Sequence, residues 1–276
     1  MNARILTLLL AASLVTAAGG LPDRDLRGGA PKTTDTPWTF TPAASRADWE
    51  ARARDIREQV LVSCGLWPMP ERTPLHARVF DRVERDGYSI EKVDLQPWPG
   101  VHLGGNLFRP LGRGPGPFPA ILNPHGHWTN GRIEDGERGG IPPRCIAFAR
   151  QGMIALSIDM IGYNDTKQFG DHRKCFQDPT NALWGISVMG LQTWNAVRAL
   201  DFLASLPDAD TNRLACTGAS GGGTQTFMLG ALDDRPAAVA PIVMVSHTMQ
   251  GGCVCENAPG LRIRHFNVEI AAAAAP

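Results

Sequence analysis

The sequence predicts an α/β fold in which helices cover both faces of a mostly parallel sheet. From residue 118 onward, short apolar runs alternate with longer segments of helical periodicity, a pattern typical of parallel strands joined by right-handed crossovers. A second observation is that Arg213–Thr224 passes from an apolar run through a glycine-rich turn into a helix-like segment. Third, 276 residues of which 43% are hydrophobic can bury a sizeable core.

The charge of the sequence does not indicate a nucleic-acid partner. The formal net charge is zero, and no basic patch alternates with aromatic residues, so nucleic acid is not an expected partner.

The sequence predicts a signal peptide over residues 1–18. Its signals are the positive charge of Arg4, the apolar run Ile5–Val15 and the small residues that follow. The alternative is an uncleaved anchor. A cleaved signal predicts a secreted or periplasmic protein with no membrane span in the mature chain, in a compartment that permits disulfides.

Local sequence signals predict helices and strands along the whole chain. Residues 19–45, rich in Pro, Gly, Thr and Asp, are expected to form a flexible lead-in. A helix over 46–64 follows, with a capping box at Ser45 and Asp48 and a stop at Gly65. Alternating apolar and polar residues on either side of a turn predict an antiparallel hairpin over 88–108. Apolar runs predict the other strands, and helical spacing of apolar residues predicts the other helices. The expected strands are 88–95, 101–108, 118–123, 153–158, 214–217 and 237–245, and the further helices are 144–151, 181–206 (with Trp184 on its buried face) and 224–232.

The glycine-rich turn carries the chemistry. Gly218-Ala-Ser-Gly-Gly222 fits G-x-S-x-G between a strand and a helix, the context in which this motif presents a nucleophilic serine. The turn is so tight that Ser220 must adopt a strained backbone conformation, and its neighbours must lack bulk. The N–H of Gly221 then lies at a helix start, where it can bind a developing oxyanion. The alternative is a glycine-rich turn in which Ser220 is merely polar.

Two motifs together resemble α/β-hydrolases: Thr217–Thr224 and the loop Pro124-His-Gly-His-Trp128. Within that fold, residues 48–276 are similar to the acetylxylan-esterase-like exported hydrolases. The further motifs are Gly65-Leu-Trp-Pro68, Arg72-Thr-Pro-Leu75, Gly105-Asn-Leu-Phe-Arg-Pro110 and Gly251-Gly-Cys-Val-Cys-Glu256. The resemblance implies a serine esterase that cleaves small acyl esters, such as acetyl groups on polysaccharide, through an acyl-serine intermediate and without a cofactor.

The resemblance also assigns roles to the loop after the strand at 118–123. By position, this loop supplies the second oxyanion N–H, from His127 or Trp128, and Gly126 lets its backbone approach the substrate. His125 and Trp128 are expected to line the site, with His125 bracing the loop. The alternative for His125 and His127 is a metal pair, but they lack a third ligand at plausible spacing, so no metal is expected.

The same resemblance implies an acid and a histidine after Ser220. The histidines that follow are His247, expected to line the site from the end of a neighbouring strand, and His265, expected to be exposed. In this fold the acid and base normally follow later strands. The domain over 46–276 is therefore expected to be C-terminally incomplete, with its acid and base beyond residue 276.

The sequence allows more than one state of the cysteines and more than one function. The chain has six cysteines; Cys216 is expected to be a buried free thiol, while Cys253 or Cys255 could pair with Cys145 or Cys175, or all could be free. The function could also be that of a peptidase of the same fold, or of a non-catalytic binding or relict domain.

Overall fold

The computed structural model describes residues 36, 38–137 and 139–275. The predicted signal peptide, and the predicted lead-in except for residues 36 and 38–45, lie outside them. The helices are α1 (Arg46–Ser63), α2 (Ile141–Arg150), α3 (Pro179–Leu183), α4 (Val188–Ser205), α5 (Gly221–Leu232) and α6 (Asn267–Ala272). The strands are β1 (Arg78–Arg85), β2 (Tyr88–Trp98), β3 (Val101–Pro110), β4 (Phe118–Leu122), β5 (Asp135–Gly136), β6 (Gly139–Gly140), β7 (Ile154–Ile158), β8 (Ala209–Ala219) and β9 (Pro236–Ile242). None of the described helices combines the length and apolarity needed to cross a bilayer.

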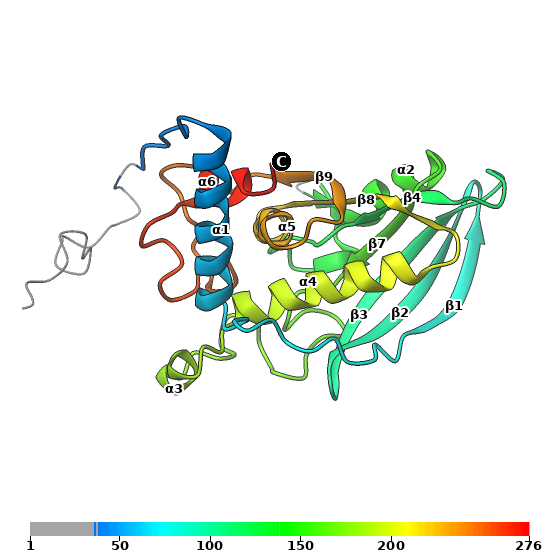
Figure 1. The fold of residues 1–276 in the computed structure, drawn as a ribbon. Coiled ribbons are helices and arrows are strands. Elements are labelled where there is room, and N and C mark those ends of the chain that lie inside the picture. The colour runs from blue at the N-terminus through cyan, green and yellow to red at the C-terminus, as the bar shows by residue number, and fades with distance from the viewer. Residues whose placement is uncertain (1–35, 37, 138, 276) are drawn as a thin grey trace, which may run out of the picture. The chain divides into compact units, whose positions relative to one another are not determined.

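Seven strands form one sheet in the order β1-β2-β3-β7-β4-β8-β9 (Figure 1). The strands β7, β4, β8 and β9 run parallel to one another, and β1, β2 and β3 are each antiparallel to their neighbours. Helix α2 packs on one face of the sheet, and α4 and α5 pack on the other. The predicted α/β fold with an antiparallel hairpin at one edge is therefore confirmed.

The sequence did not reveal β1. All eight of its residues are exposed, so no alternation of apolar and polar side chains marks it as a strand. Its backbone pairs with β2, and ion pairs across the two strands join Arg78 to Asp94 at 2.7 Å and Asp81 to Lys92 at 2.7 Å. This strand therefore forms because it pairs with β2, and such pairing between strands cannot be seen in the alternation of apolar and polar residues along one strand.

The predicted helix 181–206 is interrupted in the structure. Gly185 has a φ of 67° and ends α3, and the Ser187 hydroxyl then caps α4 by accepting a hydrogen bond from the N–H of Gly190 at 3.0 Å. Trp184 falls in the break and is 82% exposed, so its predicted place on a buried helix face is wrong. The cap at Ser187 competes with continuation of the helix, and helical spacing alone does not show this.

Strand β9 ends three residues earlier than predicted, at Ile242 rather than Val245. Val243 and Met244 have φ values of 65° and 72°, which end an extended strand and turn the chain. Among the described strands, β9 pairs with β8 alone and so lies at the edge of the sheet. This early turn decides where the residues after β9 lie relative to the candidate site.

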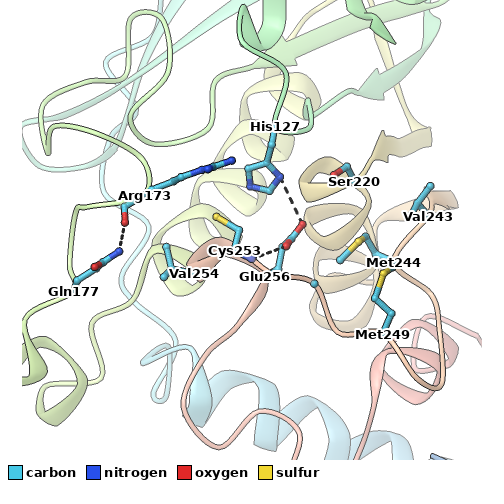
Figure 2. Close-up of a pocket in the computed structure, with 12 residues that line it drawn as sticks. His127, Arg173, Gln177, Ser220, Val243, Met244, Met249, Cys253, Val254 and Glu256 are labelled. Carbon is cyan, nitrogen blue, oxygen red and sulfur yellow. Dashed lines mark hydrogen bonds and ion pairs between the residues drawn. The ribbon is translucent and has the colours of Figure 1, made fainter. Parts of the chain in front are cut away.

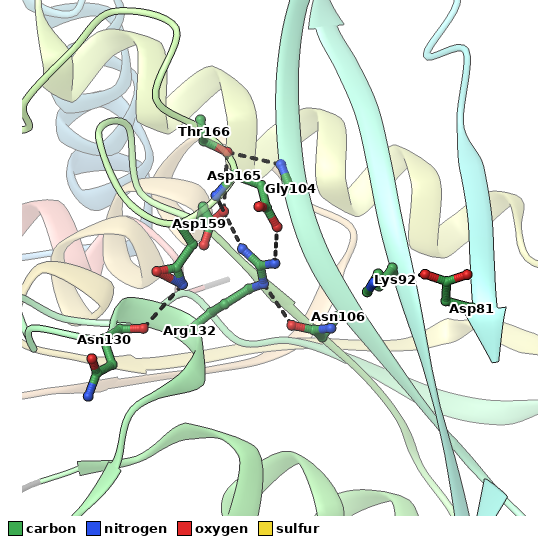
Figure 3. A network of polar contacts seen from close by, with 10 residues as sticks. Asp81, Lys92, Gly104, Asn106, Asn130, Arg132, Asp159, Asp165 and Thr166 are labelled. Atoms are coloured by element: carbon green, nitrogen blue, oxygen red, sulfur yellow. Dashed lines mark hydrogen bonds and ion pairs between the residues drawn. The ribbon is translucent and has the colours of Figure 1, made fainter. Parts of the chain in front are cut away.

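An ion-pair network around the buried side chain of Arg132 joins the end of β7 to the segment that follows β4 (Figure 3). The guanidinium of Arg132 contacts the carboxylates of Asp159 and Asp165, and its Nε donates to Oδ1 of Asn106 at 2.7 Å. The Arg132 and Asp159 side chains are only 7% and 0% exposed. The N–H of Asp165 also donates to Asp159 at 3.0 Å. The network therefore anchors the chain directly after the loop 124–128.

Candidate active site

Ser220 lies at a sharp turn between β8 and α5. Its φ of 57° and ψ of −124° are values that residues with a side chain rarely adopt. A Cβ atom on Gly222 would come within 2.3 Å of the carbonyl oxygen of Pro124, and one on Gly218 within 2.5 Å of the same atom. The turn and the loop 124–128 thus pack backbone against backbone, which explains the glycines and holds the strained conformation of Ser220 in place.

Two backbone N–H groups beside Ser220 are available to an oxyanion. Gly221 is the first residue of α5, so its N–H lies at the positive end of the helix dipole. The loop after β4 passes close by, since a Cβ on Gly126 would lie 3.0 Å from Cβ of Ser220. Within the described residues, neither the N–H of Gly221 nor that of His127 has a hydrogen-bond partner. The oxyanion role stays a prediction for both residues.

Ser220 and His127 line a pocket of about 610 Å³ (Figure 2). In the close-up, Ser220 and the apolar side chains of Val243 and Met244 lie on one side, and Arg173 lies across the pocket. The other lining residues are Gln177, Met249, Gly251, Gly252, Cys253, Val254 and Glu256. A partly apolar cavity of this size with a few polar groups is suited to a small ligand or to one end of a larger one.

The His127 imidazole points across the pocket toward Glu256 (Figure 2). Its Nδ1 lies 3.7 Å from Oε1 of Glu256, and its Nε2 lies 3.0 Å from Sγ of Cys255. Beside them, Nε2 of His172 lies 3.3 Å from Sγ of Cys253. The ligand atoms of these two histidines and two cysteines all lie within 4.8 Å of one another, so together they could hold a metal ion. Sequence spacing did not reveal this group because its members come from three separate loops.

His125, predicted to line the site, is instead fully buried beneath the loop. Its Nδ1 donates to the carbonyl oxygen of Gly126 at 2.6 Å, and its Nε2 accepts the N–H of Met160 at 3.0 Å. Both ring nitrogens are therefore used in bracing backbone, which leaves none for a substrate. Burial lowers the pKa of His125 to about 3, and the nearby charge of Arg132 acts in the same direction.

The free energy of unfolding should fall as the pH is lowered through the range in which His125 takes up a proton in the unfolded protein but not in the folded protein. The folded pKa of about 3 lies below the ordinary value of 6.5, so between these values the unfolded state binds the extra proton. The free energy of unfolding should then drop by up to about 1.4 kcal/mol per pH unit. Urea unfolding at several pH values from 7 to 4.5 measures this slope. The variant His125→Gln should show a slope smaller by about one proton, and equal slopes would contradict the assignment.

Trp128 and His247, both predicted to line the site, do not line the Ser220 pocket. The Trp128 ring packs against Gly139, where a Cβ would come within 2.6 Å of the ring, and against the apolar cluster under α2. His247 borders a separate pocket, and its carbonyl oxygen accepts the N–H of Trp38 at 2.8 Å. Since the chain turns at the end of β9, it leaves Ser220 before it reaches His247.

No side chain of the described residues hydrogen-bonds the Ser220 hydroxyl. His265, predicted to be exposed, is 5% exposed, and its Nε2 lies 3.0 Å from Oδ2 of Asp55 on α1. The prediction was wrong because α6 and its preceding loop fold back against α1. Asp233 is paired with Arg235 at 2.6 Å. None of these groups is placed to take a proton from Ser220.

All six cysteines are free thiols in the structure. Cys216 is buried in β8, as predicted. Cys145 lies on α2, where the side-chain N–H of Asn123 donates to its Sγ at 2.9 Å. The suggested pairing of Cys145 with Cys253 or Cys255 is therefore wrong, because α2 covers a different part of the sheet from the loop after β9.

Comparison with known proteins agrees with this fold and turn. The family model of acetyl xylan esterase matches residues 100–247, more than half of the chain. The chain is 26% identical over 176 residues to the putative hydrolase YtaP of Bacillus subtilis, covering 62% of this chain and 58% of that protein. It is 26% identical over 216 residues to the acetyl esterase Axe7A of Xylanibacter ruminicola, and the match covers 73% of this chain and 43% of that protein. The chain thus spans about half the length of the curated relatives it matches.

Solved structures support the same relationship. The methylesterase BT1017 superposes with a TM-score of 0.72 at 30% identity, covering 85% of this chain and 51% of that chain. A putative acetyl xylan esterase from Bacteroides fragilis superposes with a TM-score of 0.69 over 91% of this chain and 71% of its own, and at 17% identity it supports the fold alone. With its α/β-hydrolase fold, the chain belongs to the acetyl xylan esterase family.

Proposed function

We propose that the protein is a serine esterase that removes acetyl groups from carbohydrate through an acetyl-Ser220 intermediate. The observation that carries this proposal is the strained turn that holds Ser220 next to the loop 124–128, with two backbone N–H groups that have no partner in the described part of the chain. Membership of the acetyl xylan esterase family and the match to an acetyl esterase support the ester as substrate.

In this mechanism, Oγ of Ser220 attacks the acetyl carbonyl and the N–H groups of Gly221 and His127 bind the oxyanion. The sugar alcohol leaves, and water then hydrolyses the acetyl-serine. Val243 and Met244 lie on the Ser220 side of the pocket, where an acetyl methyl group would sit, and Arg173 lies where sugar hydroxyls would be. One oxyanion N–H contributes about 10²–10³-fold in rate in comparable enzymes.

Among the described residues, no side chain is placed to accept the proton of Ser220. The acid and histidine that the family resemblance implies stay a prediction, and activity is measured on the full-length protein.

The match to a methylesterase favours a second candidate, hydrolysis of a methyl ester. In that reaction the sugar carries the carboxyl group, and methanol is the alcohol that leaves when Ser220 is acylated. Arg173 at the pocket wall would suit a neighbouring carboxylate of such a substrate. Both candidates use the same turn and the same oxyanion donors.

The two candidates differ in the product that they release. Acetylated xylan and methyl-esterified pectin are the two substrates. We expect acetate to be released from the xylan at least about tenfold faster than methanol is released from the pectin, a difference of about 1.4 kcal/mol in activation free energy. Methanol without acetate would replace the first candidate by the second. Release of neither product by folded protein, or faster cleavage of peptide anilides, would contradict both, and the latter would indicate a peptidase.

A further inference from the structure

The wall of the Ser220 pocket holds a compact group of two imidazoles and two thiols. We propose that His127, His172, Cys253 and Cys255 bind a zinc ion. Their ligand atoms, one from each residue, all lie within 4.8 Å of one another. Cys253 and His127 also line the pocket, so the ion would lie in its wall rather than in a distant part of the fold.

The distances between the ligand atoms are close to those of tetrahedral coordination. With Zn–S near 2.3 Å and Zn–N near 2.0–2.1 Å, neighbouring ligand atoms in such a site are about 3.3–3.8 Å apart. Nε2 of His127 lies 3.0 Å from Sγ of Cys255, and Nε2 of His172 lies 3.3 Å from Sγ of Cys253. These two pairs are a few tenths of an ångström closer than in a tetrahedral site, and every other pair lies within 4.8 Å, so small side-chain movements would admit an ion.

The second nitrogen of each imidazole faces an oxygen acceptor, within hydrogen-bond distance in His172 and at 3.7 Å in His127. Nδ1 of His172 lies 2.6 Å from the carbonyl oxygen of Ile161, a distance at which it donates a hydrogen bond. Nδ1 of His127 faces the buried carboxylate of Glu256, which also accepts the N–H of Cys253 at 3.0 Å. Carbonyl and carboxylate partners of this kind hold metal-binding histidines with the Nε2 lone pair directed at the ion.

The donor set points to zinc and to a structural role. Two thiolates and two neutral imidazoles are a common zinc ligand set, and both thiols would release their protons on binding, so the two thiolates balance the charge of the ion. Four protein ligands leave no open position for water or substrate, unlike a catalytic zinc site. Cys255 and His172 are buried, whereas His127 and Cys253 are partly exposed toward the pocket, which provides an entry path.

An ion here would join three loops around the pocket. His127 follows β4, His172 follows β7, and Cys253 and Cys255 follow β9. It would hold the imidazole of the same residue whose backbone N–H is the proposed oxyanion donor. That consequence rests on the proposed function, but zinc binding itself does not, so the two can fail separately.

Metal analysis of the purified protein tests the proposal without an activity assay. We expect about one zinc ion per chain, as four ligands make one closed site. The zinc content should fall at least about tenfold in His172→Gln and in the double variant Cys253→Ser/Cys255→Ser, because the ligand count drops below four. Cys175→Ser is the matched control, a buried neighbouring cysteine outside the group, and it should keep its zinc.

A second measurement covers variants that fail to fold. Metal-free wild-type protein titrated with Co²⁺ should develop the absorption of tetrahedral cobalt with thiolate ligands, saturating at about one equivalent. Absence of zinc together with absence of this spectrum would overturn the proposal. So would a disulfide between Cys253 and Cys255, detected by mass before and after reduction in protein purified with zinc present.

Discussion

Replacing Ser220 with alanine should lower ester hydrolysis by about 10⁴-fold or more, because an acyl-enzyme can no longer form. The substitution removes one hydroxyl that has no hydrogen-bond partner within the described residues, so stability should change little. Acetate release from acetylated xylan and urea unfolding of the same samples measure the two effects. Full activity in Ser220→Ala would show that the nucleophile lies elsewhere.

Replacing Ser220 with glycine separates the effect of backbone strain on stability from the effect of the hydroxyl on activity. At a φ of 57° and a ψ of −124°, a residue with a Cβ costs about 1–3 kcal/mol, and glycine avoids most of this at an entropic cost of about 0.5–1 kcal/mol. Ser220→Gly should therefore be as inactive as Ser220→Ala but about 1 kcal/mol more stable. If the glycine variant were the less stable of the two, the strained turn would not be present in solution.

Arg132→Met should lower the free energy of unfolding by about 3–5 kcal/mol, because it leaves the buried carboxylate of Asp159 without its cation. Methionine retains most of the volume, so the loss of charge dominates. Urea unfolding at pH 7 provides the measurement. Arg213→Met is the matched control: its pair with Asp210 is 2.6 Å long but the arginine is 55% exposed, so the loss should stay below about 1 kcal/mol.

Equal losses in the two arginine variants would contradict the view that burial decides the effect. The Arg132 network also anchors the segment after the loop 124–128, so a folded Arg132→Met protein should lose activity as well. That loss should appear in the turnover number, since the N–H of His127 is proposed to act on the transition state.

The sequence predicts those parts of the fold that depend on short-range sequence patterns. The apolar run at Leu214–Thr217, the glycines after it and the helix that follows predict the end of β8, the turn and α5, although β8 begins five residues earlier than predicted, at Ala209. The break before α4 and the early end of β9 depend instead on a cap at Ser187 and on left-handed backbone at Val243. Such features compete with periodicity and leave only weak traces in a single sequence.

The same limit applies to the site. Ser220, Gly221 and His127 belong to two short motifs, and the structure brings these motifs together as predicted from the resemblance. The opposite wall of the pocket comes from loops after β7 and β9, whose residues show no periodicity. Gly251-Gly-Cys-Val-Cys-Glu256 was visible as a family motif but without a role, and His172 had no signal at all.

Covalent labelling tests the role of Ser220 most directly. The full-length protein is treated with a fluorophosphonate probe, digested with trypsin and analysed by mass spectrometry. The peptide Leu214–Arg262 contains only two serines, Ser220 and Ser246, and fragmentation tells them apart. One probe per chain on Ser220, abolished in Ser220→Ala, is the expected result. A probe on any other residue, or undiminished labelling of Ser220→Ala, would contradict the proposal.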